Sequence, residues 1–173
     1  MEEIIDQLDE KGTLIGTVDK KIAHRDGLWH RAVHVWVIND NNEILLQQRC
    51  SDKDLYPNFW DCSFAGHIVA GESSIIGAIR EGKEELGIDV DTTKMELLFI
   101  NKEQITYGNI KSNEFVDVYL LRQNIKVEDI IIQKEEVAGV KYISLEEFFK
   151  LICEKDGKLI PHNIEYQKLK EIL

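Results

Sequence analysis

Three glutamates, Glu81, Glu84 and Glu85, are spaced so that a helix would bring their side chains together. At about 100° per residue they fall within one arc of about a quarter-turn. Like charges at these spacings destabilise a bare helix by roughly a few tenths of a kcal/mol each, a cost that a bound cation would remove. Carboxylate oxygens in this arrangement suit Mg²⁺ or Mn²⁺ held jointly with the phosphates of a ligand. The alternative interpretation is a solvated acidic face, because Glu is a good helix former at exposed positions.

The residues around these glutamates favour the metal site. Residues 66–88 read GHIVAGESSIIGAIREGKEELGI. This segment resembles the Nudix box, G-x5-E-x7-R-E-U-x-E-E-x-G-U, in which U is a bulky apolar residue. Gly82 departs from the pattern, since it stands at an apolar position and costs ~1 kcal/mol of helix stability relative to Ala. We expect it to allow close backbone contact with a sheet. The matching positions are Gly66, Glu72, Arg80, Glu81, Glu84, Glu85, Gly87 and Ile88.

The resemblance implies a Nudix hydrolase with an α/β (α+β) fold, in which a mixed β-sheet is sandwiched between helices. Such an enzyme uses a divalent metal to hydrolyse a diphosphate joined to another group, X, through attack of water at phosphorus. The resemblance also implies that Glu81 and Glu85 are the main metal ligands and that the backbone carbonyl of Gly66 completes the set. Glu84 would be a third ligand or the general base, so Glu84 and Glu85 are both catalytic candidates.

Other charged residues have supporting roles by the same resemblance. Arg80 and Glu72 are expected to pair and to hold the loop against the helix rather than to touch the substrate. The general base of this family comes either from the box or from a later loop, where Glu135 and Glu136 are the candidates. Glu136 is therefore a third catalytic candidate. This stretch is equally consistent with a solvated turn, and no periodicity separates the two interpretations.

A second resemblance covers residues 24–60. The runs HRDGLWHRAVHVWVIND and LLQQR and the P-x-x-W at 57–60 resemble the branch that contains type 1 isopentenyl-diphosphate isomerase. In that isomerase a second metal site consists of three histidines and two glutamates. We therefore expect a partial site for a second divalent metal, such as Zn²⁺, Mn²⁺ or Fe²⁺. In the other interpretation, His67 donates a hydrogen bond to a phosphate oxygen of the ligand. The alternative is surface or hydrogen-bonding histidines. The matching residues are His24, His30, His67 and Glu114, and Ser112 stands where the other glutamate would be.

Ala65 argues against isomerase chemistry, which needs a cysteine just before the glycine that opens the box. A methyl group cannot donate or accept a proton, and Cys62 is three residues away on an extended strand that rises ~3.3 Å per residue. Hydrolysis is therefore expected. The alternatives are an isopentenyl-diphosphate isomerase-like protein or a non-catalytic ligand-sensing Nudix module. Of the other histidines, His34 is expected to pack within a strand and His162 has no companion.

The elements that must position these residues follow from hydrophobic periodicity and turn residues. A helix is expected over 73–86, with Ile75, Ile79 and Leu86 facing the core opposite the glutamates and Gly87 ending it. Helices are also expected from the capping-box spacing of residues 144–147 and over about 164–173, with Asn163 as a possible cap. Strands are expected at 3–8, 13–19, 31–38, 43–49, 59–65, 95–106, 114–122 and 139–143, with hairpins joining the first pair and the pair 31–38 and 43–49.

Composition excludes several other classes of protein. The 173 residues include 32 acidic and 21 basic side chains, a formal charge of −11, which opposes binding to nucleic acid or an anionic membrane. The expected partner is a small-molecule diphosphate, with a homodimer as the prior for a soluble enzyme. Three cysteines at no metal-like spacing, and neither a leader nor a membrane span, predict a cytoplasmic protein. No linker is visible, so a single domain over 1–173 is expected, with a β-hairpin at about 1–20 and a closing helix at about 164–173.

Overall fold

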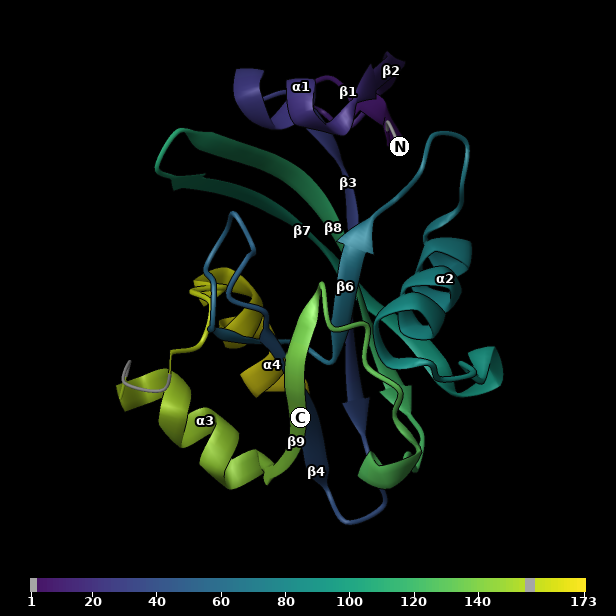
Figure 1. The fold of residues 1–173 in the computed structure, drawn as a ribbon, viewed down its shortest axis with the longest axis vertical. Coiled ribbons are helices and arrows are strands. Elements are labelled where there is room, and N and C mark those ends of the chain that lie inside the picture. Colours follow the sequence, from purple (N-terminus) through teal and green to yellow (C-terminus); the bar gives the residue numbers. More distant parts are fainter. Residues whose placement is uncertain (1–2, 155–157) are drawn as a thin grey trace.

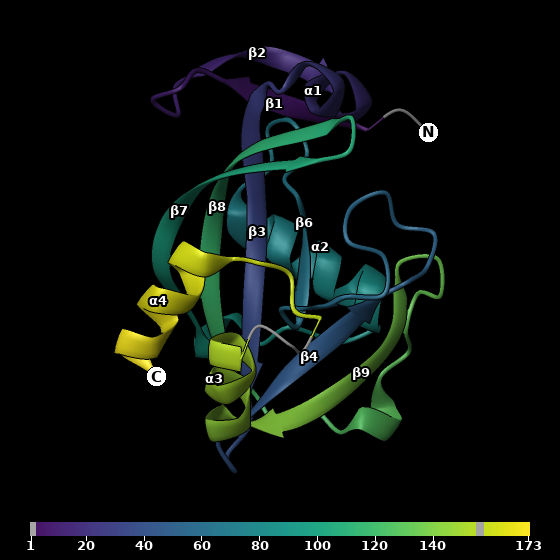
Figure 2. The same ribbon diagram turned by 90° about the vertical axis from the view of Figure 1, so that its left-hand side faces the viewer.

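A computed structural model describes residues 3–154 and 158–173, and its described strands form one nine-stranded mixed sheet (Figure 1). Helix α2 lies on one side of this sheet, and α3 and α4 lie on the other (Figures 1 and 2). This arrangement confirms the expected α/β (α+β) fold. In chain order the elements are β1 Ile4–Leu8, β2 Leu14–Asp19, α1 Lys20–Asp26, β3 Trp29–Ile38, β4 Glu43–Arg49, β5 Trp60–Asp61, β6 Phe64–His67, α2 Ser74–Leu86, β7 Met95–Tyr107, β8 Ile110–Arg122, β9 Val137–Ser144, α3 Leu145–Glu154 and α4 Asn163–Ile172, with 3₁₀ turns at Thr92–Lys94 and Val127–Asp129.

Strand β3 organises the sheet. It pairs in parallel with β8 along its whole length, and it pairs antiparallel with β1 at its start, with β6 in its middle and with β4 at its end. Strand β4 continues the sheet to β5 and β9. The sheet therefore divides beyond β3 into a β6 arm and a β4 arm, and the space between the two arms is open to side chains from both.

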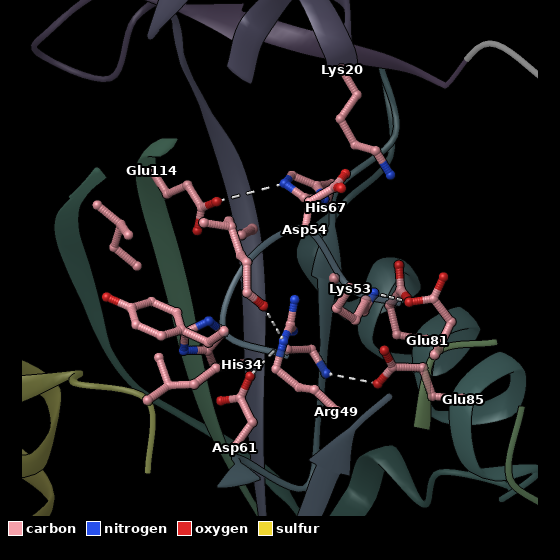
Figure 3. A pocket seen from close by; sticks show the side chains of 18 of the residues that line it. Lys20, His34, Arg49, Lys53, Asp54, Asp61, His67, Glu81, Glu85 and Glu114 are labelled. Carbon is pink, nitrogen blue, oxygen red and sulfur yellow. Dashed lines mark hydrogen bonds and ion pairs between the residues drawn. The ribbon is translucent and has the colours of Figure 1, made fainter. Parts of the chain in front are cut away.

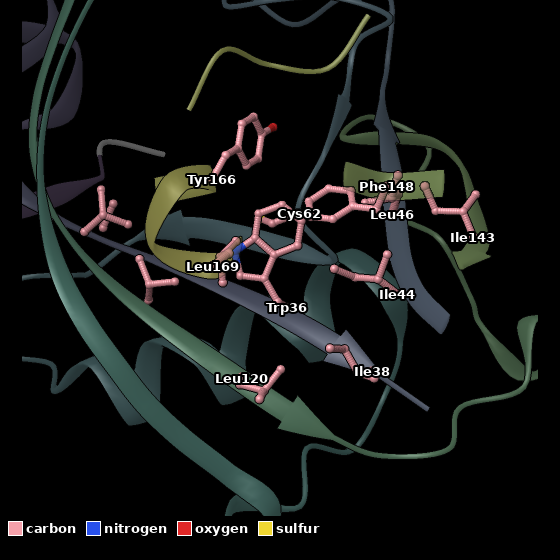
Figure 4. Close-up of a cluster of buried hydrophobic side chains, with 13 residues drawn as sticks. Trp36, Ile38, Ile44, Leu46, Cys62, Leu120, Ile143, Phe148, Tyr166 and Leu169 are labelled. Atoms are coloured by element: carbon pink, nitrogen blue, oxygen red, sulfur yellow. The ribbon is translucent and has the colours of Figure 1, made fainter. Parts of the chain in front are cut away.

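Alternation along β3 builds a separate core on each face of the sheet. Trp36 packs with Phe148 of α3 and Leu169 of α4 on one face, where Trp36 is fully buried (Figure 4). Val35 and its odd-numbered neighbours pack against α2 on the opposite face, with Ala78 among their contacts. Two thin hydrophobic layers thus hold the sheet between the helices.

Helix α2 begins and ends where the sequence predicts, but it turns a different face to the sheet. Ser73 caps its start and Gly87, with φ 67°, ends it. Ile75 and Ile79, expected in the core, are 46% and 39% exposed, and only Leu86 of that stripe is buried. The face toward the sheet instead carries small residues and two of the glutamates. The buried residues of this helix are, in order, Ser74, Gly77, Ala78, Glu81, Gly82, Glu85 and Leu86.

Gly82 allows this face of α2 to pack against the sheet. A Cβ at that position would lie 2.9 Å from Val90 and 3.2 Å from Phe64 of β6, closer than side chains normally pack. The expected close contact between the Gly82 backbone and the sheet is therefore confirmed. Small residues let the helix axis approach β6, and the approach brings the glutamate side chains to the rim of the sheet.

The N-terminal region contains a helix that the sequence analysis missed. The β1–β2 hairpin forms with its turn at residues 9–12, and α1 then follows directly. The Asp19 side chain accepts hydrogen bonds from the first-turn amides, and Gly27 at φ 68° ends the helix. This Asp-to-Gly pair was a readable signal. His24 consequently lies on a helix.

The predicted strand at 59–65 is wrong as one element, because the chain changes partners within it. Strand β5 pairs with β4, whereas β6 pairs with β3. Ser63 holds the crossing point: its hydroxyl donates to the carbonyl of Leu45 at 2.6 Å and accepts from the amide of Val37 at 2.8 Å. This crossing opens the gap between the two arms of the sheet.

The remaining elements differ from expectation mainly at their ends. The strands expected at 31–38, 114–122 and 139–143 all begin earlier, and the strand at 43–49 is matched. Ser144 caps α3 by accepting from the amide of Glu147. His162, not Asn163, precedes α4, and it provides no side-chain cap. Among the described residues no helix is long and apolar enough to cross a membrane.

Candidate active site

A cavity of about 480 Å³ lies between the two arms of the sheet (Figure 3). Its walls come from α1, from α2, from β6, from the loop at residues 53–56, and from β7 and β8 on the far side. Most of the predicted site residues line it: Gly66, Glu81, Glu84, Glu85, Glu136, His24, His67 and Glu114. His30 is fully buried directly behind the histidines of this wall.

Two carboxylates of the helix are buried at the cavity edge. The side chain of Glu85 accepts hydrogen bonds from the Gln47 amide group at 3.0 Å and from the Ala65 backbone amide at 3.2 Å. Burial, with the nearby charge of Glu81, raises the pKa of Glu85 to about 7. Burial also raises the pKa of Glu81 to about 7, although Arg80 opposes the shift. The positive charge around the two carboxylates therefore does not fully offset the effect of burial on their ionisation.

Gly66 and Glu84 complete the acidic group in different ways. A Cβ at Gly66 would lie 2.1 Å from the Glu81 carboxyl carbon, so only glycine allows this approach. Glu84 is more exposed, with 53% of its side-chain surface accessible, and contacts Arg80 at 3.3 Å. The solvated acidic face considered from the sequence therefore describes Glu84 but not its two neighbours.

Arg80 and Glu72 form the expected pair. The Arg80 guanidinium donates to both carboxylate oxygens of Glu72, at 3.1 and 3.0 Å, and to the backbone carbonyl of His67 at 2.8 Å. Glu72 also accepts from the amide of Val69 at 3.1 Å. These bonds tie the loop before α2 to the helix. They hold Gly66 beside the glutamates.

The predicted histidine cluster is assembled in the structure. The Nε2 atoms of His24 and His67 lie 3.1 Å apart, and Glu114 Oε1 lies 3.5 Å from His30 Nε2 and 3.6 Å from His67 Nε2. Ser112, at the position of the missing carboxylate, donates to Glu114. One ligand atom from each of the four residues lies within 4.8 Å of the others.

The histidines of this cluster differ in the direction of their pKa shifts. Burial, together with the charges of His67 and His30, lowers the pKa of His24 to about 4. Burial lowers the pKa of His67 as well. For His30, burial opposes protonation, but the nearby Glu114 carboxylate outweighs it and raises the pKa. Neutral imidazole nitrogens beside a carboxylate are a suitable donor set for a borderline divalent metal.

Comparison with known proteins assigns the family. A sequence model of the NUDIX domain matches residues 28–162, most of the chain. The chain belongs to the Nudix hydrolase family. It is 39% identical over 180 residues to Nudix hydrolase 3 of Arabidopsis thaliana, covering 99% of this chain and 23% of that protein. It is also 34% identical over 181 residues to a Nudix hydrolase of Clostridium acetobutylicum, covering 99% and 87%. This Nudix hydrolase therefore spans only about a quarter of its plant relative.

The isomerase-like branch and the fold are supported by two further matches. An isopentenyl-diphosphate delta-isomerase of Gibberella zeae is 33% identical over 188 residues, covering 88% of this chain and 73% of that protein. The crystal structure of DR0079 from Deinococcus radiodurans superposes with a TM-score of 0.75 at 20% identity, covering 96% and 98% of the two chains. As a member of this family, the Nudix hydrolase is an enzyme of the pyrophosphohydrolase class.

Cys62 is kept out of the site of this Nudix hydrolase, as expected. It is fully buried in the core on the α4 face, and its thiol contacts the carbonyl of Phe64 at 3.4 Å. Burial raises the pKa of this thiol well above its ordinary range. Ala65, which lines the cavity, is the residue at the position where the isomerase has its cysteine.

Several cavity residues of this Nudix hydrolase were missed from the sequence. Lys20, Arg49 and Lys53 come from three separate segments and bring positive charge into the cavity. Lys53 pairs with Glu136, and Arg49 Nη1 lies 3.6 Å from Asp61. Isolated cations in a sequence carry no spacing signal, so only the fold could bring them together. Glu135, by contrast, is exposed and does not line the cavity.

One histidine expectation was incomplete and one was wrong. His34 is buried within β3 as expected, but its Nδ1 also lies 2.9 Å from Glu165 of α4 and its ring lines the cavity. His162 does have companions: its Nε2 lies 3.2 Å from Asp61 and its Nδ1 lies 3.0 Å from Glu103. These partners are far away in sequence, which is why the local pattern gave no sign of them.

Proposed function

We propose that this Nudix hydrolase cleaves a diphosphate joined to another group, X, by attack of water at phosphorus, and that it depends on Mg²⁺ or Mn²⁺. The buried pair of Glu81 and Glu85 carries the proposal. Each is less than a tenth exposed, and no cation among the described residues contacts Glu85. Arg80 contacts Glu81 but not Glu85, so full ionisation of both carboxylates at neutral pH is favoured by a further positive charge from outside the chain.

The donor set fits a hard divalent cation. Glu81 and Glu85 would hold it, with the exposed Glu84 and the carbonyl of Gly66 as further oxygen ligands. When bound, the cation would neutralise the charge that develops on the nonbridging phosphate oxygens. The orientation of these ligands comes from the chain itself, because Arg80 fixes Glu81 and Gln47 fixes Glu85 before any ligand enters.

The cations of the cavity would orient the diphosphate. Lys20, Arg49 and Lys53 line the same cavity as the glutamates, and they counter the repulsion expected from a chain of charge −11. Guanidinium and ammonium groups bind phosphate oxygens by charge-assisted hydrogen bonds. Lys53 now pairs with Glu136, so substrate binding would compete for that ammonium group and free the carboxylate.

The general base is one of Glu84, Glu85 and Glu136. Glu136 lines the cavity and belongs to the loop between the second 3₁₀ turn and β9, whereas Glu84 and Glu85 belong to α2. Substituting each by Gln separates the roles. Loss of the base should remove the acidic limb of the pH–rate profile, whereas loss of a positioning carboxylate should lower the rate at every pH.

The test of hydrolysis is a comparison of Glu85→Gln with the wild type on a panel of nucleoside diphosphate sugars, dinucleotides, deoxynucleoside triphosphates and prenyl diphosphates with Mg²⁺. We expect the wild type to release a monophosphate from at least one compound, and Glu85→Gln to lose at least about a hundredfold in rate. The matched control is Glu171→Gln on the exposed face of α4, which should keep full activity. Ligand binding by the wild type without turnover on any compound would instead support a sensing module.

We further propose that His24, His30, His67 and Glu114 form a second divalent-metal site. His30 supports this, because its Nδ1 is held by the carbonyl of Leu28 at 2.8 Å while its Nε2 is buried without a hydrogen-bond partner and faces Glu114. A metal-ligating histidine has this arrangement. Calorimetric titration with Zn²⁺ or Mn²⁺ should show, apart from any binding at the glutamates, a binding event that remains in Glu85→Gln and disappears in His30→Ala. Equal binding by wild type and His30→Ala would contradict the second site.

The methyl group of Ala65 favours hydrolysis over isomerisation in this cavity. Among the described residues no cysteine lines the cavity, since Cys62 is in the core and Cys50 and Cys153 lie elsewhere. We therefore expect no incorporation of deuterium from solvent into isopentenyl diphosphate. Measurable exchange would support the isomerase-like alternative.

A further inference from the structure

His34 is a fixed, buried imidazole with one ring nitrogen unused. The residue is 6% exposed, and its Nδ1 is held 2.9 Å from the Glu165 carboxylate. The other oxygen of Glu165 accepts from the indole of Trp36 at 2.7 Å, so the carboxylate cannot turn away. Among the described residues the His34 ring makes one hydrogen bond, at Nδ1, and the ring lines the cavity, which leaves Nε2 available to a ligand.

The surroundings of His34 determine what it can bind. Burial opposes its protonation, but Glu165 outweighs this effect and raises the pKa of His34, which favours an Nε2 that donates. A His34 ring nitrogen lies within 4.8 Å of carboxylate oxygens of Glu103 and Glu114. Figure 3 shows His34 and Asp61 near each other, apart from the Glu81 and Glu85 carboxylates. A donor beside acceptors suits a ligand group that can both accept and donate.

A hydroxyl group is the simplest group of this kind. A second anion would meet Glu103, Glu114 and Asp61, and like charges at such distances disfavour it. A bare metal cation is less suited, because His162 Nδ1, which lies 3.0 and 3.1 Å from the two Glu103 oxygens, already offsets the charge of that carboxylate while leaving it able to accept a further hydrogen bond. A hydrocarbon would leave His34 Nε2 and the carboxylates desolvated without partners, which buried polar groups do not tolerate well.

We propose that His34 is a specificity-determining residue that donates a hydrogen bond to a hydroxyl group on X, with Glu103 accepting from the same hydroxyl, so that the enzyme takes hydroxylated rather than hydrocarbon diphosphates. The inference rests on the proposed function, because it assumes that the diphosphate lies at the glutamates. His34 would then contact the other end of the substrate. Sugar and nucleoside diphosphates belong to the favoured class, and prenyl diphosphates belong to the disfavoured class.

The test uses a matched pair of compounds, dimethylallyl diphosphate and its 4-hydroxy analogue, with a nucleoside diphosphate sugar as a larger hydroxylated compound. We expect the wild type to favour a hydroxylated compound at least about tenfold in kcat/KM. His34→Phe fills the space but removes the hydrogen bond, and should lower kcat/KM for that compound about 10- to 100-fold while changing dimethylallyl diphosphate less than about threefold.

A second variant and a second readout keep the inference testable. His34→Gln retains a donor and should recover part of the preference that His34→Phe loses, and thermal unfolding shows that each variant is folded. An equal loss on both classes of compound, or no loss with His34→Phe, would overturn the role of His34. If the wild type hydrolyses nothing, the proposed function fails on its own. Calorimetric binding of the same pair with Mg²⁺ then decides, because equal affinities in wild type and His34→Phe would overturn the inference.

Discussion

Two buried carboxylates, of which only Glu81 contacts a cation of the described chain, Arg80, are the main feature of this site at the scale of single residues. Glu81 and Glu85 are both hydrogen-bonded, yet their pKa values are raised to about 7 because burial disfavours their charged forms. In the metal-free protein they are held in place at a cost to stability. Site preorganisation of this kind commonly trades stability for function.

This cost predicts a pH dependence of stability. Glu85 ionises near 4.5 in the unfolded chain and near 7 in the folded one, so its protonated form stabilises the fold at low pH and that contribution is lost as pH rises through about 7. Glu85→Gln stays neutral and avoids the loss. The free energy of unfolding of metal-free Glu85→Gln, relative to that of the metal-free wild type, should therefore increase by about 3 kcal/mol as pH rises from 4.5 to 7.5.

Urea unfolding at several pH values in the presence of a chelator measures this gain. The control Glu171→Gln replaces an exposed carboxylate and should follow the wild type at every pH. A difference between Glu85→Gln and the wild type that does not change with pH would contradict the burial argument.

At the scale of elements, the position of α2 depends on the absence of large side chains from its sheet-facing side. Gly77, Ala78 and Gly82 on its sheet-facing side leave room for β6 and its loop, and isoleucines lie on the outer face. A helix with large apolar residues on the inner side would stand farther from the sheet. Glu81 and Glu85 would then be withdrawn from Gly66 and from the cavity.

Gly82→Leu tests this packing by restoring the residue type that the Nudix box has at this position. Its Cβ alone would lie 2.9 Å from Val90, so we expect a loss of about 1–3 kcal/mol in the free energy of unfolding. Ile75→Ala, on the exposed face of the same helix, is the control and should change it by less than about 1 kcal/mol. Denaturant unfolding compares the two, and an unchanged or increased stability in Gly82→Leu would contradict the close approach.

At the scale of the whole molecule, α4 is joined to the central strand by polar bonds as well as by apolar packing. Glu165 of α4 is fully buried and bonds to His34 and Trp36 of β3, which precede it by 131 and 129 residues. This connection closes the core on one face and also orients the wall of the cavity. The end of the chain therefore contributes to the site without touching the glutamates.

Glu165→Ala should consequently destabilise the protein strongly. It leaves His34 and the Trp36 indole without their buried partner, and removing one partner of a buried ion pair costs about 3–5 kcal/mol. Glu171→Ala, on the exposed side of the same helix, should cost less than about 1 kcal/mol. Thermal unfolding provides the comparison, and similar melting temperatures for the two variants would show that the bonds to Glu165 contribute little.

The sequence by itself determined the family, the fold class and the acidic helix, because the box is a local pattern whose residues lie within a few helical turns. It also predicted the companions of His67, through the second resemblance. It did not determine which face of α2 is buried, because the spacing of the isoleucines does not show how closely the helix can approach β6 at Gly82. The placement of Lys20, Arg49 and Lys53, and of His34 against Glu165, was decided only by tertiary structure. Those contacts join segments that are remote along the chain, and their geometry depends on how the sheet divides beyond β3.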